Sequence, residues 1–103
     1  MAYKGTFKTA YLQREIVVDA KVAANVIVGQ LVTLSGDNIT SATTADAATH
    51  IIAQSDMTME YGHVPVEYRD YKYSNVVAAS TTKKKVALFK ITNKDDLNVS
   101  EIS

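Results

Sequence analysis

The sequence predicts a mainly β protein, at most α+β, built as a small barrel or sandwich-like domain with one short helix and an extended N-terminal arm. Three observations lead to this prediction. Apolar and polar residues alternate over short stretches, turn-forming residues separate these stretches, and no long helical periodicity occurs. The chain has 103 residues and 47% of them are hydrophobic, so it is long enough for one domain with a buried core.

The clearest predicted strand covers residues 15–22, where Ile16, Val18, Ala20 and Val22 share one parity. Residues 26–34 are apolar on both parities, which predicts one central strand. The cluster at residues 35–38 (Ser-Gly-Asp-Asn) predicts a turn, and because Ile39 resumes the apolar pattern, a hairpin is expected there.

The Ala-rich residues 43–49 allow one or two helical turns, with Thr43 and Asp46 placed as in a weak capping box. Residues 51–53 form a short buried run. Residues 86–91 (VALFKI) are the last clear strand, and a polar tail is expected from Lys94 onward.

Residues 64–73 contain apolar and aromatic residues on two conflicting parities. Val64, Val66 and Tyr68 share one parity, whereas Tyr71 and Tyr73 share the other. One extra residue reverses the face of a strand, so we expect a bulge or turn near residues 69–70.

The first thirteen residues are predicted to be a separate extended arm, followed by a single β-rich domain at 14–103. Tyr3, Phe7 and Tyr11 lie four positions apart, which places them on one face of a strand. Two interpretations remain open. The arm could be an edge strand folded onto its own core, or it could add to the sheet of a partner and insert its aromatic side chains there.

The composition limits the function classes. Eleven basic and eleven acidic residues give a net charge of zero, without the basic excess typical of nucleic-acid-binding chains. The chain has no cysteine, which excludes disulfides, thiolate metal sites and thiol nucleophiles. It shows no signal peptide and no membrane-spanning apolar stretch, so a soluble protein made in the cytoplasm, without membrane or nucleic-acid partners, is expected.

The sequence predicts no catalytic, cofactor-binding or metal site, and therefore no enzyme. Asp46 and His50 stand four positions apart, but two ligands do not make a metal site, and a histidine at a helix end is the simpler interpretation. His63 lies in an expected turn. The basic run at residues 83–85 (Lys-Lys-Lys) is interpreted as a solvated segment that leads into a strand, or as a contact for an acidic patch on a neighbouring subunit.

Tyrosine is in excess within residues 61–73. Tyrosine offers a large flat contact area with a polar tip, which protein interfaces favour. These side chains are candidates for subunit contact, and ordinary packing of strand tyrosines is the alternative. The four residues are Tyr61, Tyr68, Tyr71 and Tyr73.

The middle of the chain resembles bacteriophage head decoration proteins of the lambda type. The similarity lies in the order of three segments within residues 25–92. They are 29–34 (GQLVTL) leading through Ile39, 42–53 (ATTADAATHIIA), and 64–71 (VPVEYRDY).

This resemblance implies a small β-rich fold without catalysis that acts in the virion, on the outer surface of the head. Members of this family sit on the head as trimers, contact the major capsid protein and stabilise the shell by bridging capsomers. Residues 1–13 correspond by position to the arm that lies across the shell, so Tyr3, Phe7 and Tyr11 would contact the capsid. The arm has Gly5 as its sole glycine and the chain has no tryptophan, which differs from the family.

Two other function classes stay open. One is another small virion subunit, such as a head–tail connector or a tail-tube protein. The other is a small cytoplasmic module that binds a peptide or ligand in a groove formed by residues 61–73.

Overall fold

A computed structural model describes residues 2–9, 13–55 and 76–102 of the chain, and it confirms the predicted small, mainly β fold. Its strands and two short 3-10 helices are, in chain order, β1 (Ala2–Phe7), β2 (Glu15–Val22), β3 (Val26–Ile27), β4 (Leu31–Ser35), β5 (Asn38–Ser41), η2 (Ala45–Ala47), β6 (His50–Ile52), β7 (Val76–Val77), β8 (Ser80–Lys90), η4 (Lys94–Asp96) and β9 (Leu97–Ile102).

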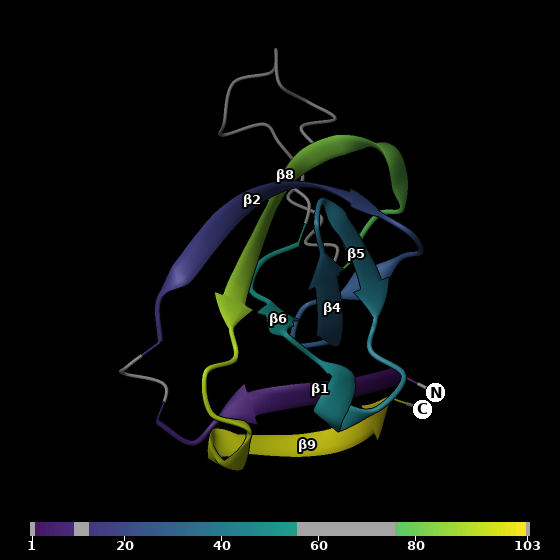
Figure 1. Cartoon of the computed structure of the whole chain (residues 1–103). Coiled ribbons are helices and arrows are strands. Elements are labelled where there is room, and N and C mark those ends of the chain that lie inside the picture. Colours follow the sequence, from purple (N-terminus) through teal and green to yellow (C-terminus); the bar gives the residue numbers. More distant parts are fainter. Residues whose placement is uncertain (1, 10–12, 56–75, 103) are drawn as a thin grey trace, which may run out of the picture.

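Five strands close into a barrel in the order β2-β5-β4-β6-β8 (Figure 1). All neighbouring pairs are antiparallel except β2 and β5, which are parallel. Strands β3 and β7 form a small two-stranded sheet. Strands β1 and β9 form a second one, and the two together are called the ribbon below.

The core has two layers because β4, β6 and β8 bury side chains on both of their faces. Val32, Ile52 and Leu88 point into the barrel and belong to its aliphatic interior. Their immediate neighbours Leu31, Ile51 and Phe89 point outward, where a second apolar cluster forms under the ribbon. This explains why residues 31–34 are apolar on both parities, as expected of a central strand.

The hairpin between β4 and β5 confirms the turn expected at residues 35–38. Ser35 pairs with Asn38, and Gly36 adopts a positive φ of 61°. A two-residue connection of this kind requires left-handed backbone, which glycine adopts without steric cost. Strand β2 likewise has the predicted bounds, and its burial follows the predicted parity from Val18 to Val22, whereas Ile16 is exposed.

The single strand predicted for residues 26–34 is wrong, because a turn at Gly29 divides it into β3 and β4. Gly29 has a φ of 88°, and the N–H of Gln30 donates to the carbonyl of Ile27 at 3.0 Å. The buried Gln30 side chain stabilises this turn. Its Oε1 accepts from the Ile27 N–H at 3.0 Å, and its Nε2 donates to Ser41 Oγ at 2.8 Å.

Two further expectations need correction. The helical segment is one short 3-10 turn capped by Thr44, whose hydroxyl accepts from the Ala47 N–H at 3.2 Å, and not by Thr43. The polar tail expected from Lys94 is instead the helix η4 followed by strand β9, because Leu97 is buried in the outer apolar cluster and the six residues of β9 pair with β1.

Candidate interaction surface

The ribbon brings the two terminal segments of the described chain together. Its register pairs Ala2 with Ile102 at one end and Phe7 with Leu97 at the other. The Lys8 N–H donates to the Asp96 carbonyl at 2.7 Å, which continues this ladder beyond the strands. In Figure 1 the ribbon lies across one end of the barrel, with β9 as its outer strand.

Two of the three aromatic residues expected to contact a capsid lie on the inner face of β1. Tyr3 and Phe7 are partly buried, and both pack against the outer apolar cluster of this same chain. The rings of Phe7 and Phe89 meet edge to face, with centroids 5.9 Å apart and an interplanar angle of 84°. For residues 2–7, the structure therefore corresponds to the edge strand folded onto its own core. Tyr11 lies outside the described residues.

Close backbone contacts also hold β1 on the barrel. The Gly5 N–H donates to the Gly29 carbonyl at 2.9 Å, and Lys4 forms a β-bridge with Gln30. Gly5 is buried, and a Cβ atom there would lie 3.0 Å from Leu31 Cδ2. Such a close approach favours a residue without a side chain.

A carboxylate fixes the segment that follows β1. Asp96 Oδ1 accepts from the Thr9 N–H at 3.1 Å, and its Oδ2 accepts from the Thr9 hydroxyl at 2.5 Å. Gln13 Nε2 also donates to Oδ2, at 3.4 Å. The arm is thus connected to the rest of the protein in the middle of β1, at Lys4 and Gly5, and just beyond its end, at Thr9.

The outer edge of β9 is open in the part of the chain that the structure describes. Hydrogen-bonded pairs alternate along an antiparallel ladder. Because Lys8 and Asp96 form one such pair, Asn98 and Ser100 direct their backbone groups toward β1. Val99 and Glu101 therefore direct theirs away from it, and β9 pairs with no other described strand.

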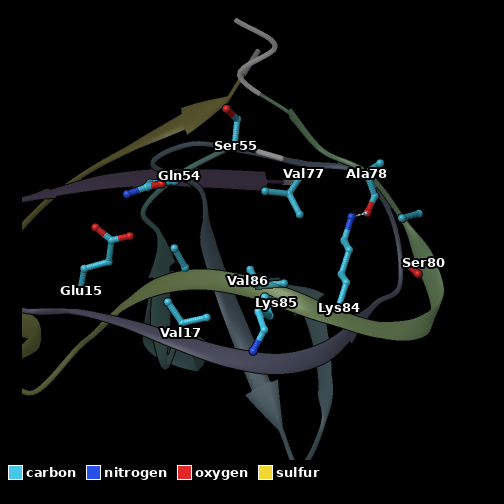
Figure 2. A pocket seen from close by; sticks show the side chains of 12 residues that line it. Glu15, Val17, Gln54, Ser55, Val77, Ala78, Ser80, Lys84, Lys85 and Val86 are labelled. Atoms are coloured by element: carbon cyan, nitrogen blue, oxygen red, sulfur yellow. Dashed lines mark hydrogen bonds between the residues drawn. The ribbon is translucent and has the colours of Figure 1, made fainter. Parts of the chain in front are cut away.

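A groove lies on another side of the barrel, between β8 and the chain on either side of residues 56–75 (Figure 2). Its walls include Gln54, Val77 and Val86, and Lys84 Nζ crosses it to donate to the Ala78 carbonyl at 2.6 Å. The tyrosines predicted for subunit contact, Tyr61, Tyr68, Tyr71 and Tyr73, lie outside the described residues.

The basic run at residues 83–85 lies inside strand β8 and not ahead of a strand as expected, and its side chains are largely engaged within the chain. Lys83 Nζ lies 3.1 Å from Asp37 Oδ2, and its hydrogen bond and charge hold the pKa of Asp37 below its usual value. Lys85 Nζ lies 3.8 Å from Asp19 Oδ1, in a pair that is mostly solvated. Pairs this exposed contribute little to stability.

His50 is a buried titratable residue whose pKa departs from its ordinary value. Only 9% of it is exposed, and its Nδ1 lies 2.8 Å from the Thr49 hydroxyl. Burial, and to a lesser degree the charge of Lys90, lower the pKa of His50. Within the described ranges, no group of three or more His, Cys, Asp or Glu side chains could hold a metal ion, and no helix is long and apolar enough to cross a membrane.

Sequence reasoning missed strand β9, although a weak signal for it exists. Leu97 and Val99 alternate with Asn98 and Ser100, which is the period of a strand. The preceding polar residues 94–96 masked this pattern.

Comparisons with protein families, with curated proteins and with solved structures find no match for this chain.

Proposed function

We propose that this protein is a bacteriophage capsid decoration protein. It binds the major capsid protein on the outer surface of the head as a homotrimer, bridges capsomers and stabilises the shell without catalysis. The observation that carries the proposal is the ribbon, a two-stranded sheet that packs on the barrel with one face and whose β9 edge pairs with no other strand among the described residues.

Two properties of the described chain support this function. The barrel interior is filled by aliphatic side chains such as Val32, Ile39 and Leu88, all fully buried, so binding would use the surface and not an internal cavity. An open sheet edge provides a row of backbone donors and acceptors, which can pair with an extended segment of another protein. Many copies that each make such a contact would add up to a stiff shell.

The sequence resemblance adds to this argument because it covers segments that form the barrel wall. The GQLVTL segment contributes β4, and residues 50–52 contribute β6. The sequence resemblance assigns the contact with the shell to an arm formed by residues 1–13, and here we assign it to the ribbon. The contact with the shell would then come from a docked strand pair in place of a free arm.

The amount of this chain in purified particles tests the proposal. Phage would be induced from the strain that carries the gene, and the chain would be quantified against the major capsid protein on a stained gel. We expect about one copy per shell subunit. A few copies per particle would contradict decoration and indicate a connector or tail component. Absence from particles would favour a cytoplasmic binding module, for which the groove of Figure 2 is a candidate site.

A further inference from the structure

We infer that the outer edge of β9 receives one extended strand from another protein, and that this strand carries lysine or arginine beside Glu101. The inference rests on the proposed function, in which that other protein is the shell subunit. It assigns the contact to β9, near the C-terminal end of the chain, and leaves the aromatic side chains of β1 in their own core.

The backbone of β9 is ready for such pairing without any rearrangement. Val99 and Glu101 direct their N–H and C=O groups to the outside, because the ladder to β1 uses those of Asn98 and Ser100. A strand added at this edge would turn the ribbon into a three-stranded sheet. Each outward residue would contribute up to two hydrogen bonds to it.

Within the described residues, this edge carries only one of the usual protections against pairing, the charge of Glu101. Natural edge strands are commonly short or carry proline, lysine or a bulge. Strand β9 has six residues in regular register, Glu101 is its sole charged residue, and none is proline or glycine. The side chain of Val99 lies next to the edge and is 41% exposed, although it shares the face of the buried Leu97. An incoming strand would cover Val99, which adds apolar contact to the backbone pairing.

The alternative in which β1 itself leaves to join a partner is costly. Its release would break the six-residue ladder with β9, the Gly5 hydrogen bond to Gly29 and the hydrogen bonds between Thr9 and Asp96. It would also expose Tyr3 and Phe7. Pairing at β9 requires none of these losses.

Charge distinguishes a foreign strand from a second copy of this chain. In an antiparallel β9–β9 pair centred on Val99, each Glu101 would stand opposite Leu97 of the other copy, next to the turn that carries Asp95 and Asp96. Lys94, the cation of that turn, is engaged with the Asp46 carbonyl. At each end of such a pair, Glu101 of one copy would approach Asp95 and Asp96 of the other, and these carboxylates would repel each other. A foreign strand with lysine or arginine beside Glu101 would instead be attracted to it.

The experiment measures binding of purified chain to heads prepared from a phage that lacks this gene. Val99→Pro removes an outward N–H and leaves the ladder to β1 intact, since that ladder uses the neighbouring residues. Val99→Thr is the matched control, because it keeps the N–H and the branched shape. We expect binding at least tenfold weaker for Val99→Pro than for the wild type, a loss of at least about 1.4 kcal/mol, and within about twofold of the wild type for Val99→Thr.

A charge reversal gives an independent test should the proline variant not fold. Glu101→Lys should weaken binding severalfold, most strongly at low salt, whereas Glu15→Lys on β2 should leave it unchanged. If Val99→Pro and Glu101→Lys both bind like the wild type, the inference is overturned while the proposed function stands. A free dimer that Val99→Pro dissociates would also overturn it, by assigning the edge to a second copy. Failure of the wild type to bind these heads would instead refute the proposed function.

Discussion

Asp96 accepts hydrogen bonds from both the backbone N–H and the hydroxyl of Thr9, a residue 87 positions earlier in the chain. Its own carbonyl accepts from the Lys8 N–H at 2.7 Å. This one residue therefore joins the end of β1 to the start of β9. The relationship explains why the N-terminal segment lies on the barrel and does not extend away from it.

Replacement of Asp96 by alanine should loosen the ribbon. The variant loses three part-buried hydrogen bonds to its carboxylate, two from Thr9 and a longer one from Gln13. We therefore expect a decrease of about 2 kcal/mol in the free energy of unfolding. Urea denaturation followed by circular dichroism would measure it. Asp95→Ala is the matched control, because the Asp95 side chain is exposed on the same turn, and its effect should stay within about 0.5 kcal/mol. Equal effects for the two variants would show that Asp96 has no special role.

Phe7→Ala should lower the stability of the free chain. Phe7 is partly buried, packs on the outer apolar cluster and meets Phe89 edge to face. We expect a loss of about 2 kcal/mol, or a fall in Tm of roughly 10 °C. Phe7→Leu, which keeps apolar volume, should lose less than half of that. An unchanged Tm for Phe7→Ala would contradict the docked position of β1 and restore the free arm.

Gly29→Ala should destabilise the protein through its backbone alone. A Cβ at this position would meet nothing within 4 Å, yet the φ of 88° is one that other residues rarely adopt. The expected cost is about 1 kcal/mol. Gly29→Asn should cost less, since asparagine tolerates left-handed backbone better than most residues. Thermal unfolding of the two variants would show the order, and the reverse order would contradict the turn between β3 and β4.

Stability should decrease as the pH falls below about 6.5, the ordinary pKa of histidine. Burial lowers the pKa of His50 in the folded chain, so in this range the unfolded chain binds a proton that the folded chain resists. The loss should grow as the pH falls from 6.5 and level off below the folded pKa. Urea unfolding between pH 5 and 8 would measure it. His50→Gln should flatten this part of the curve, and His63→Gln should not. A curve that keeps its slope in His50→Gln would contradict the assignment.

Local patterns in the sequence were enough to predict the elements that are determined by residues close together in the chain. The alternation in residues 15–22 predicts β2, and in its second half, from Val18 to Val22, one face of the strand is solvated and the other is buried or half-buried. The β4–β5 hairpin follows from the turn residues around Gly36. The fold class needed no more than these short alternating runs.

Elements that depend on distant partners could not be predicted in the same way. Strand β9 is a strand because β1 pairs with it from the other end of the chain, and Leu97 is buried only in that pairing. The turn at Gly29 was hidden because Val26 and Leu31 are both buried but in different clusters. For the candidate surface, the spacing of Tyr3 and Phe7 did indicate one shared face. It could not indicate that this face packs on the chain's own barrel.

The rupture temperature of heads tests the proposed decoration function, because a bound decoration protein would stabilise the shell. Heads that lack this chain would be titrated with the purified protein and heated while the release of DNA is followed by dye fluorescence. We expect the rupture temperature to rise with bound protein and to stop rising near one copy per shell subunit. An unchanged rupture temperature at saturating protein would refute the proposed function.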